Sequence, residues 1–171
     1  MIELLAALAL AGAGDPSVKP WPIGPGRAYR PGAAARDGRP VAGHPCRPGG
    51  RRFAVHLELF AHRRVVIVPA GIGVATGCSY PARTRTPTGV VEVAAGARLD
   101  LGDLFRIWGR PLGPHRLASF RSNSPVRAYV GGRLVHRPIA SVPLQPGAEI
   151  VLELGAYVPP HAFFLFPKGS P

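Results

Sequence analysis

Lysine and acidic residues are both scarce in this 171-residue chain. Of its 21 basic residues only Lys19 and Lys168 are lysines, and because just 9 residues are acidic, the net charge is +12. The arginines stand singly or in pairs, with no run of five basic residues. This pattern lacks the basic stripe of a nucleic-acid-binding protein, so nucleic acid is not an expected partner. It favours a general attraction to anionic groups or surfaces.

The motifs of common enzyme classes are also missing. The chain has no Gly-x-Ser-x-Gly, no P-loop, no Cys-x-x-Cys and no dinucleotide-binding glycine fingerprint after a strand. We therefore expect neither an enzymatic activity nor a cofactor. No apolar run is long enough to span a bilayer, so no transmembrane segment is expected either.

Residues 1–14 form an apolar run that ends in small residues, which is typical of the hydrophobic part of a signal peptide. The basic residues that open a signal peptide are missing, and Glu3 stands among the first residues. Two interpretations stay open: a leader whose true start lies further upstream, or a short amphipathic helix. The two cysteines of the chain favour the leader, and with it an extracytoplasmic location, either secreted or associated with the cell envelope.

Residues 15–45 are rich in proline, glycine and arginine. Such a segment buries too little apolar surface to offset the entropy of ordering it, so we expect an extended linker. The remaining residues, 46–171, are rich enough in apolar side chains to form one globular domain.

The two cysteines, Cys46 and Cys78, are 32 positions apart and bracket a strand and its return. A cysteine pair behind an apolar leader predicts a disulfide. Closing a loop of this size stabilises a fold by roughly 3.7 kcal/mol through the entropy of the unfolded chain.

Strict alternation of apolar and other residues over 53–59 predicts a half-buried strand, with His56 and Glu58 on the face opposite the core. Residues 61–64 predict a turn, and 65–68 the return strand of a hairpin. A further short strand is expected over 90–94.

Residues 101–108 predict the one confident helix of the domain. Asp100 precedes it as the N-cap, Asp103 stands where a capping box needs an acceptor, and Gly109 ends it. Apolar residues at positions i, i+3, i+4 and i+7 form its buried face: Leu101, Leu104, Phe105 and Trp108.

Two later segments predict more antiparallel structure. Residues 126–130 and 133–135 flank two glycines and predict a hairpin with a primed turn. Residues 149–154 alternate, so that a strand is expected with its apolar side chains inward and with Glu149 and Glu153 facing water.

The apolar segment 163–166 predicts a final edge strand. The order of elements predicts an α+β domain, mostly antiparallel β with one short helix. The last strands, with their Gly-Gly and Pro-Gly turns, look like the second half of a β-grasp domain. A β-sandwich with a decorating helix is the alternative.

Several segments resemble a family of uncharacterised bacterial extracytoplasmic proteins. The most specific matches are Leu101–Gly109, followed by Pro111-Leu112, and Pro69–Gly73. Weaker matches extend over most of residues 46–155: Cys46, the strand 55–59, Cys78–Tyr80, Gly89–Val91, Tyr129–Gly132 and Pro143-Leu144.

The resemblance implies a histidine-rich metal site on facing strands, largely lost in this chain. Of the family's histidine positions, only His56 is still histidine, and Glu58 and Glu92 stand at two others. Arg83 and Arg85 replace two more, and a guanidinium group cannot bind a metal ion. The weak remaining metal candidates are therefore His56, Glu58 and Glu92.

Two hypotheses of function follow. The first is a non-enzymatic extracytoplasmic module, binding or structural, in which Arg83 and Arg85 bind an anionic group, because arginine recognises carboxylate and phosphate well. The alternative to a metal ion at this place is a salt-bridge cluster, in which both arginines pair with Glu58 and Glu92. The second is a transition-metal-binding protein that uses a degenerate His/Glu site.

Overall fold

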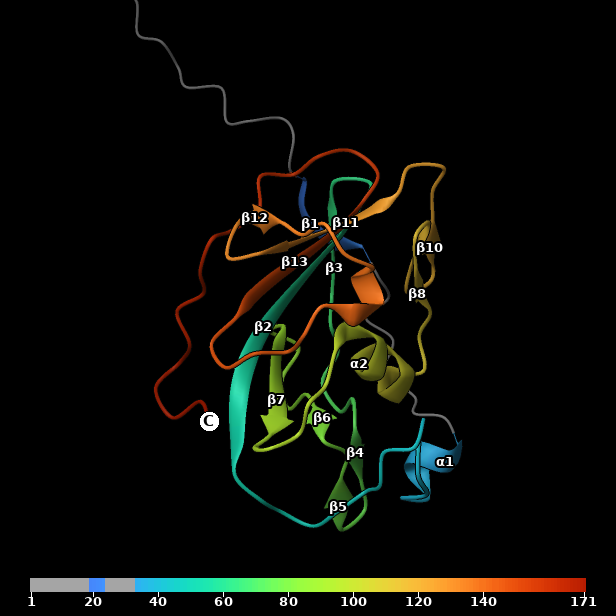
Figure 1. Ribbon diagram of the computed structural model, residues 1–171, viewed down its shortest axis with the longest axis vertical. Coiled ribbons are helices and arrows are strands. Elements are labelled where there is room, and N and C mark those ends of the chain that lie inside the picture. Colours follow the sequence, from blue (N-terminus) through green and yellow to red (C-terminus); the bar gives the residue numbers. More distant parts are fainter. Residues whose placement is uncertain (1–18, 24–32) are drawn as a thin grey trace, which may run out of the picture.

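The computed structural model describes residues 19–23 and 33–171 (Figure 1). Its centre is the long strand β2 (Arg52–Ala61), which pairs in parallel with β13 (Glu149–Leu154) along one edge. Along its other edge β2 pairs antiparallel with β7 (Val90–Ala94) over its first half and with β3 (Arg64–Val66) over its last residues.

The other elements are short. Strands that extend the same sheet are β1 (Lys19–Ile23), β6 (Ala82–Arg83), β11 (Val126–Val130) and β12 (Arg133–Leu134). Two small sheets are formed by β4 (Val74–Ala75) with β5 (Cys78–Ser79), and by β8 (Leu112–Gly113), β9 (Arg116–Leu117) and β10 (Phe120–Arg121). The helical segments are α1 (Ala33–Arg36), α2 (Leu101–Trp108) and the 3₁₀ turn η1 (Ile139–Ser141).

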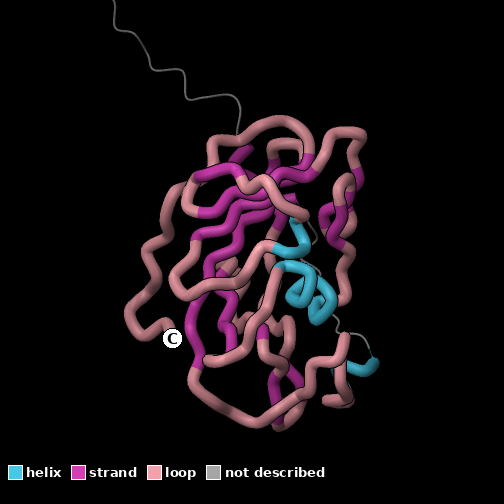
Figure 2. Tube along the Cα trace, viewed as in Figure 1, coloured by secondary structure: helices cyan, strands magenta, loops and turns pink. Residues whose placement is uncertain are grey.

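The strand order confirms the predicted α+β class, mostly antiparallel β with one short helix of more than a single turn. Within the main sheet the order runs β3, β2, β13, β11, β12, so the last strand is inserted parallel to β2 between two hairpins. In the chain, helix α2 lies between the N-terminal strands of the sheet and its C-terminal strands. It packs on one side of the sheet, where Figure 2 also shows the other helical turns. This is the β-grasp-like arrangement, and the described residues form no second large sheet of a sandwich.

The hairpin of β2 and β3 turns at His62 and Arg63, both of which have positive φ, 52° and 62°. Such a two-residue turn matches the twist of the strands, and it confirms the predicted turn. The return strand is shorter than the predicted 65–68 because the amide of Leu57, which would face Val68, donates to the carbonyl of Gly89 instead.

Helix α2 has the predicted ends. The Asp100 carboxylate accepts from the amide of Asp103, and Asp103 accepts in return from Asp100, which completes a capping box. Gly109 ends the helix in the left-handed conformation at φ 70°. All four residues of the predicted apolar face are buried: Leu101, Leu104, Phe105 and Trp108.

The disulfide between Cys46 and Cys78 is confirmed, with 5.5 Å between the two Cα atoms. Next to it, Arg47 and Ser79 exchange two backbone hydrogen bonds of 3.0 and 2.9 Å. The segment that enters β2 is thereby fixed to β5. Within the described residues, no helix combines the length and the apolar character that crossing a membrane requires.

Part of the expected linker contacts the domain. Ala35 is buried in the core, and the Tyr80 hydroxyl donates to the carbonyls of Ala34, at 3.3 Å, and of Arg39. Strand β1 pairs in parallel with β3. The expected leader, 1–14, and the linker residues 15–18 and 24–32 lie outside the described residues, and the domain boundary at residue 46 stays a prediction.

The two faces of the main sheet are covered by different segments. On one, the helix face, alternate residues of β2 and β13 pack into the main core together with α2. On the other, the C-terminal face, residues 155–166, which we call the C-terminal strap, run across the sheet, as the orange-red trace on the side opposite α2 shows (Figure 1). The prediction that 163–166 form an edge strand is wrong, because these residues cross the face without pairing to any described strand.

Two other predictions fail on the C-terminal face. Strand β2 is not half-buried, since His56 on its second face is only 4 % exposed. Glu149 and Glu153 do not face water but are 3 % and 0 % exposed. The reason is that β13 lies between β2 and β11, and that the strap covers the face to which both glutamates belong.

Candidate functional site

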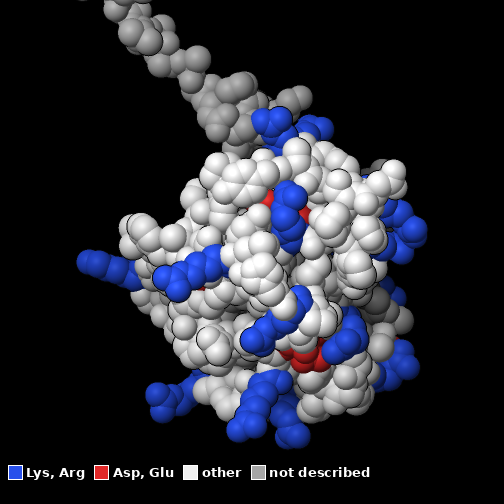
Figure 3. Space-filling model, turned by 45° about the horizontal axis from the view of Figure 1, so that its top comes forward, with Lys and Arg blue, Asp and Glu red and all other residues white. Residues whose placement is uncertain are grey.

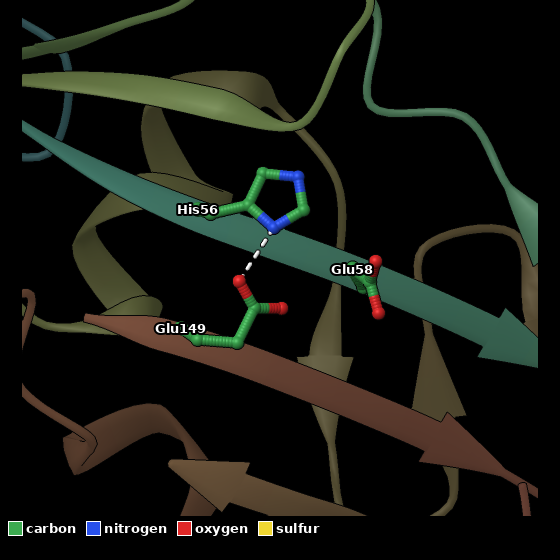
Figure 4. A group of neighbouring side chains, drawn as sticks. All are labelled: His56, Glu58 and Glu149. Carbon is green, nitrogen blue, oxygen red and sulfur yellow. Dashed lines mark hydrogen bonds and ion pairs between the residues drawn. The ribbon is translucent and has the colours of Figure 1, made fainter. Parts of the chain in front are cut away.

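The most concentrated chemistry lies in the middle of the C-terminal face, where β2 and β13 run in parallel. His56 and Glu149 stand directly opposite each other in the register. Their side chains meet, with His56 Nδ1 2.6 Å from Glu149 Oε2 (Figure 4). Both side chains are almost completely buried, at 5 % and 1 % exposure.

The second ring nitrogen of His56 defines how this pair is protonated. Nε2 lies 3.0 Å from the carbonyl oxygen of Thr88, which can only accept, so Nε2 carries a hydrogen. Nδ1 then faces the carboxylate, and a single proton is left to lie between Nδ1 and Oε2. The pair is therefore either an imidazolium with a carboxylate or a neutral imidazole with a protonated Glu149.

Glu58 is the third member of this group. It follows His56 by two residues on β2 and so lies on the same face. His56, Glu58 and Glu149 each offer one ligand atom, and the three atoms lie within 4.8 Å of one another. The Glu58 carboxylate is also bound from the strap, by His161 Nδ1 at 2.8 Å.

Glu149 has one oxygen that is not satisfied. Its Oε1 is buried and has no hydrogen-bond partner among the described residues. Figure 4 shows this oxygen on the side of the carboxylate that faces Glu58. A buried carboxylate oxygen without a donor is costly, so this position favours a proton or a cation.

The surroundings of His56 are close-fitting. The ring of Phe164, on the strap, stacks on the imidazole with centroids 3.5 Å apart and planes 8° apart. On another side a Cβ atom at Gly89 would lie 3.0 Å from Nε2 and 2.5 Å from a backbone oxygen, so only glycine fits there. A cavity of about 160 Å³ borders both His56 and Glu58 and is also lined by residues 65–68 and 87–89.

The predicted arginine cluster forms only in part. Arg83 and Arg85 both bind Glu92, at 2.7 and 3.1 Å. Glu58 does not join them, because β2 places Ala54, not Glu58, opposite Glu92. The structure therefore separates the three candidate metal ligands: His56 and Glu58 are together, and Glu92 belongs to the arginines.

Glu149 is the functional candidate that the sequence did not reveal. The alternation of 149–154 places it on the non-core face, and in an antiparallel edge strand that face would be solvated. The signal that could have found it was the β-grasp-like arrangement itself. In that arrangement the last strand lies parallel to the first, which brings Glu149 opposite His56.

Basic side chains are distributed over the whole visible surface and do not form one stripe, while acidic side chains reach it in few places (Figure 3). Each acidic residue of the described ranges has a bonded partner: Asp37, Glu58, Glu92, Asp100, Asp103, Glu149 and Glu153. Five arginines form ion pairs with these carboxylates: Arg39, Arg83, Arg85, Arg106 and Arg127.

Comparisons with family models, curated proteins and solved structures find no match to this chain. The resemblance to bacterial extracytoplasmic proteins thus stays a prediction. The function has to be argued from the geometry of the site alone.

Proposed function

We propose that this protein is a non-enzymatic binding module of an extracytoplasmic compartment, and that it binds a divalent transition-metal ion through His56, Glu58 and Glu149. The observation that carries the proposal is the unpartnered, buried Oε1 of Glu149 within a group of three ligand atoms. A cation between the three would satisfy this oxygen and neutralise the two carboxylates.

The environment of His56 suits a metal ligand. Histidines that bind metals usually donate their other ring N–H to a carbonyl or carboxylate, which fixes the tautomer. Here Nε2 donates to Thr88, which leaves the lone pair of Nδ1 for the metal. The ion would replace the proton between His56 and Glu149, so binding would release a proton and weaken as the pH falls.

The ligand set indicates which ions to test. One imidazole and two carboxylates, all from strands, resemble sites with three protein ligands and one open position, as Zn²⁺ accepts. Arg83 and Arg85 would repel a cation, but both are bound to Glu92, which reduces this repulsion. Zn²⁺ is the first choice and Mn²⁺ the second.

Binding is favoured over catalysis by access. Phe164 stacks on the imidazole, so a substrate would have to approach the ion through the cavity of about 160 Å³ that borders His56 and Glu58. The extracytoplasmic location is supported by the disulfide, since such bonds persist in oxidising compartments.

The test is isothermal titration of chelator-treated, dialysed protein with Zn²⁺ at pH 7.5, in two buffers of different ionisation enthalpy. We expect one ion per chain, with about one proton released. Glu149→Gln and His56→Gln should abolish binding, and Glu92→Gln, which changes a carboxylate outside the group, should leave it unchanged. No binding, or binding that only Glu92→Gln removes, would contradict the assignment.

The anion hypothesis for Arg83 and Arg85 has less support. Arg83 uses its guanidinium on Glu92 and on the Ser79 hydroxyl, so an added anion would have to displace an internal carboxylate. Only Arg85 keeps most of its side chain in solvent, with 65 % exposed.

A further inference from the structure

A second cavity, which shares no lining residue with the one beside His56 and Glu58, lies where the entry segment of β2 meets β5 and the end of β7. It has a volume of about 350 Å³, which is within the range of small-molecule sites. Three arginines line it, Arg47, Arg52 and Arg98, and no acidic residue does.

Arg52 provides fixed positive charge at this cavity. Its guanidinium donates only to neutral groups: the Ser79 hydroxyl at 2.9 Å and the carbonyls of Tyr80, Glu92 and Pro81 at 3.0, 3.1 and 3.3 Å. Burial, followed by the nearby charge of Arg83, lowers its pKa, and the nearby Glu92 carboxylate opposes this lowering only in part. Its two terminal nitrogens are engaged in these bonds, while its buried Nε has no hydrogen-bond partner among the described residues. A guanidinium group in this situation gains from an anion nearby.

Arg47 and Arg98 supply free donors. Both are exposed and neither has a carboxylate partner among the described residues. The backbone of Arg47 is held by its two hydrogen bonds to Ser79 and by the adjacent disulfide. The one histidine of the lining, His44, is bound to the Asp103 carboxylate of α2, so this carboxylate already has a partner.

The remainder of the wall is largely apolar. It consists of proline, alanine and leucine side chains: Pro45, Pro81, Ala94, Ala97 and Leu99. A fully hydrated inorganic ion would leave this surface unused. An apolar body attached to an anionic head would cover it.

We propose that this cavity binds a small organic carboxylate with an apolar body, its head group held by Arg47 and Arg98 in the field of Arg52. Bidentate pairing of guanidinium with carboxylate gives both strength and orientation. The proposal is independent of the metal site, which lies on other residues.

Benzoate is the probe, titrated into the ¹⁵N-labelled protein and followed by NMR, with benzamide and inorganic phosphate as matched ligands. We expect benzoate to shift amides around Arg47 and Arg98 saturably, and benzamide and phosphate to bind at least about tenfold more weakly, as the loss of a charge-assisted bond or of apolar contact predicts. If benzamide bound as tightly as benzoate, the site would not recognise charge. If phosphate bound as tightly as benzoate, the apolar wall would not contribute to binding. Either result overturns the proposal.

Variants localise the effect. Arg47→Gln and Arg98→Gln change exposed side chains, so both should fold, and each should weaken benzoate binding about tenfold or more. Arg133→Gln removes the same charge from β12, at the far edge of the sheet, and should change affinity less than twofold. An equal loss in all three variants would mean that only net charge attracts the ligand, and would overturn the site.

Discussion

The two faces of the central sheet are buried by different means. The helix face is apolar throughout and is covered by α2, so its stability depends on the area removed from water. The C-terminal face carries His56, Glu149 and Glu153 beneath the strap, and each of these depends on a specific partner. The helix face is thus stabilised by the apolar area that it buries, and the C-terminal face by pairing between buried polar groups, which we call burial by pairing.

Carboxylates on the two sides differ in the same way. At α2, burial opposes the ionisation of Asp103, but hydrogen bonds from His44, Arg106 and the Asp100 amide outweigh it and hold the pKa at about 2. On the C-terminal face, burial dominates and raises the pKa of Glu153 despite its pairing with Arg127. The charged form is thus favoured at the helix and disfavoured under the strap.

The largest effect is expected on the helix face. Trp108→Ala should lower the free energy of unfolding by roughly 3–5 kcal/mol, because it empties a large aromatic site in the core. Urea denaturation at pH 7 measures it. Tyr157→Ala, which truncates an aromatic side chain that is 55 % exposed on the strap, should cost far less. Similar losses in both variants would mean that the helix face is not the main source of stability.

The next effect tests burial by pairing. In metal-free protein, His56→Ala should lower the free energy of unfolding by about 3 kcal/mol, since it leaves Glu149 buried without a partner. The double variant His56→Leu with Glu149→Leu removes both polar groups and should be close to the wild type in stability. A double variant as unstable as the single one would show that shape, and not pairing, governs this site.

The helix face could be predicted from the sequence almost completely. The capping box of Asp100 and Asp103, the stop at Gly109 and the strand at 90–94 depend on local rules, and the structure confirms each of them. The Cys46–Cys78 bond followed from composition and spacing.

The C-terminal face could not be predicted because its burial is decided by distant segments. The alternation of apolar and polar residues along a strand identifies which side chains point away from the core. It does not reveal whether water or another segment of the chain covers them. His161 and Phe164 lie about a hundred residues beyond Glu58 and His56 in the sequence, and no local pattern connects them. The metal candidates that the sequence predicts accordingly do not include Glu149.

A third effect is a pH dependence at α2. Because its folded pKa of about 2 lies below the unfolded value of 3.8, Asp103 stabilises the fold fully above pH 3.8, and this contribution is lost as the pH falls towards 2. Asp103→Asn should therefore cost about 2 kcal/mol at pH 7. The difference from the wild type, measured by urea denaturation at each pH, should close between pH 3.8 and 2.

Glu153 is the opposite case and serves as the control. Its raised pKa means that the folded state binds the proton more tightly, so its contribution makes stability fall as the pH rises above its unfolded value of 4.5. Glu153→Gln should remove this decline. A decline that persists in Glu153→Gln, or an Asp103→Asn difference that does not change with pH, would contradict the contrast between the two faces.

The smallest effect concerns how the strap covers the C-terminal face. Phe164 stacks on His56, and Phe166 lies edge-on to Phe164 with centroids 5.1 Å apart, whereas the neighbouring Phe163 is 72 % exposed. Phe164→Ala should cost about 1 kcal/mol through the lost ring contacts. Phe163→Ala truncates the same kind of side chain where it is exposed to solvent, so the free energy of unfolding should stay within about 0.5 kcal/mol of the wild-type value.

Hydrogen exchange provides a second measurement, because loosening the strap should speed exchange of the Val158 amide, which donates to Glu153. If the two variants behaved alike in both measurements, the ring stack would not hold the strap, and Glu153 would depend on Arg127 and Val158 alone for its burial.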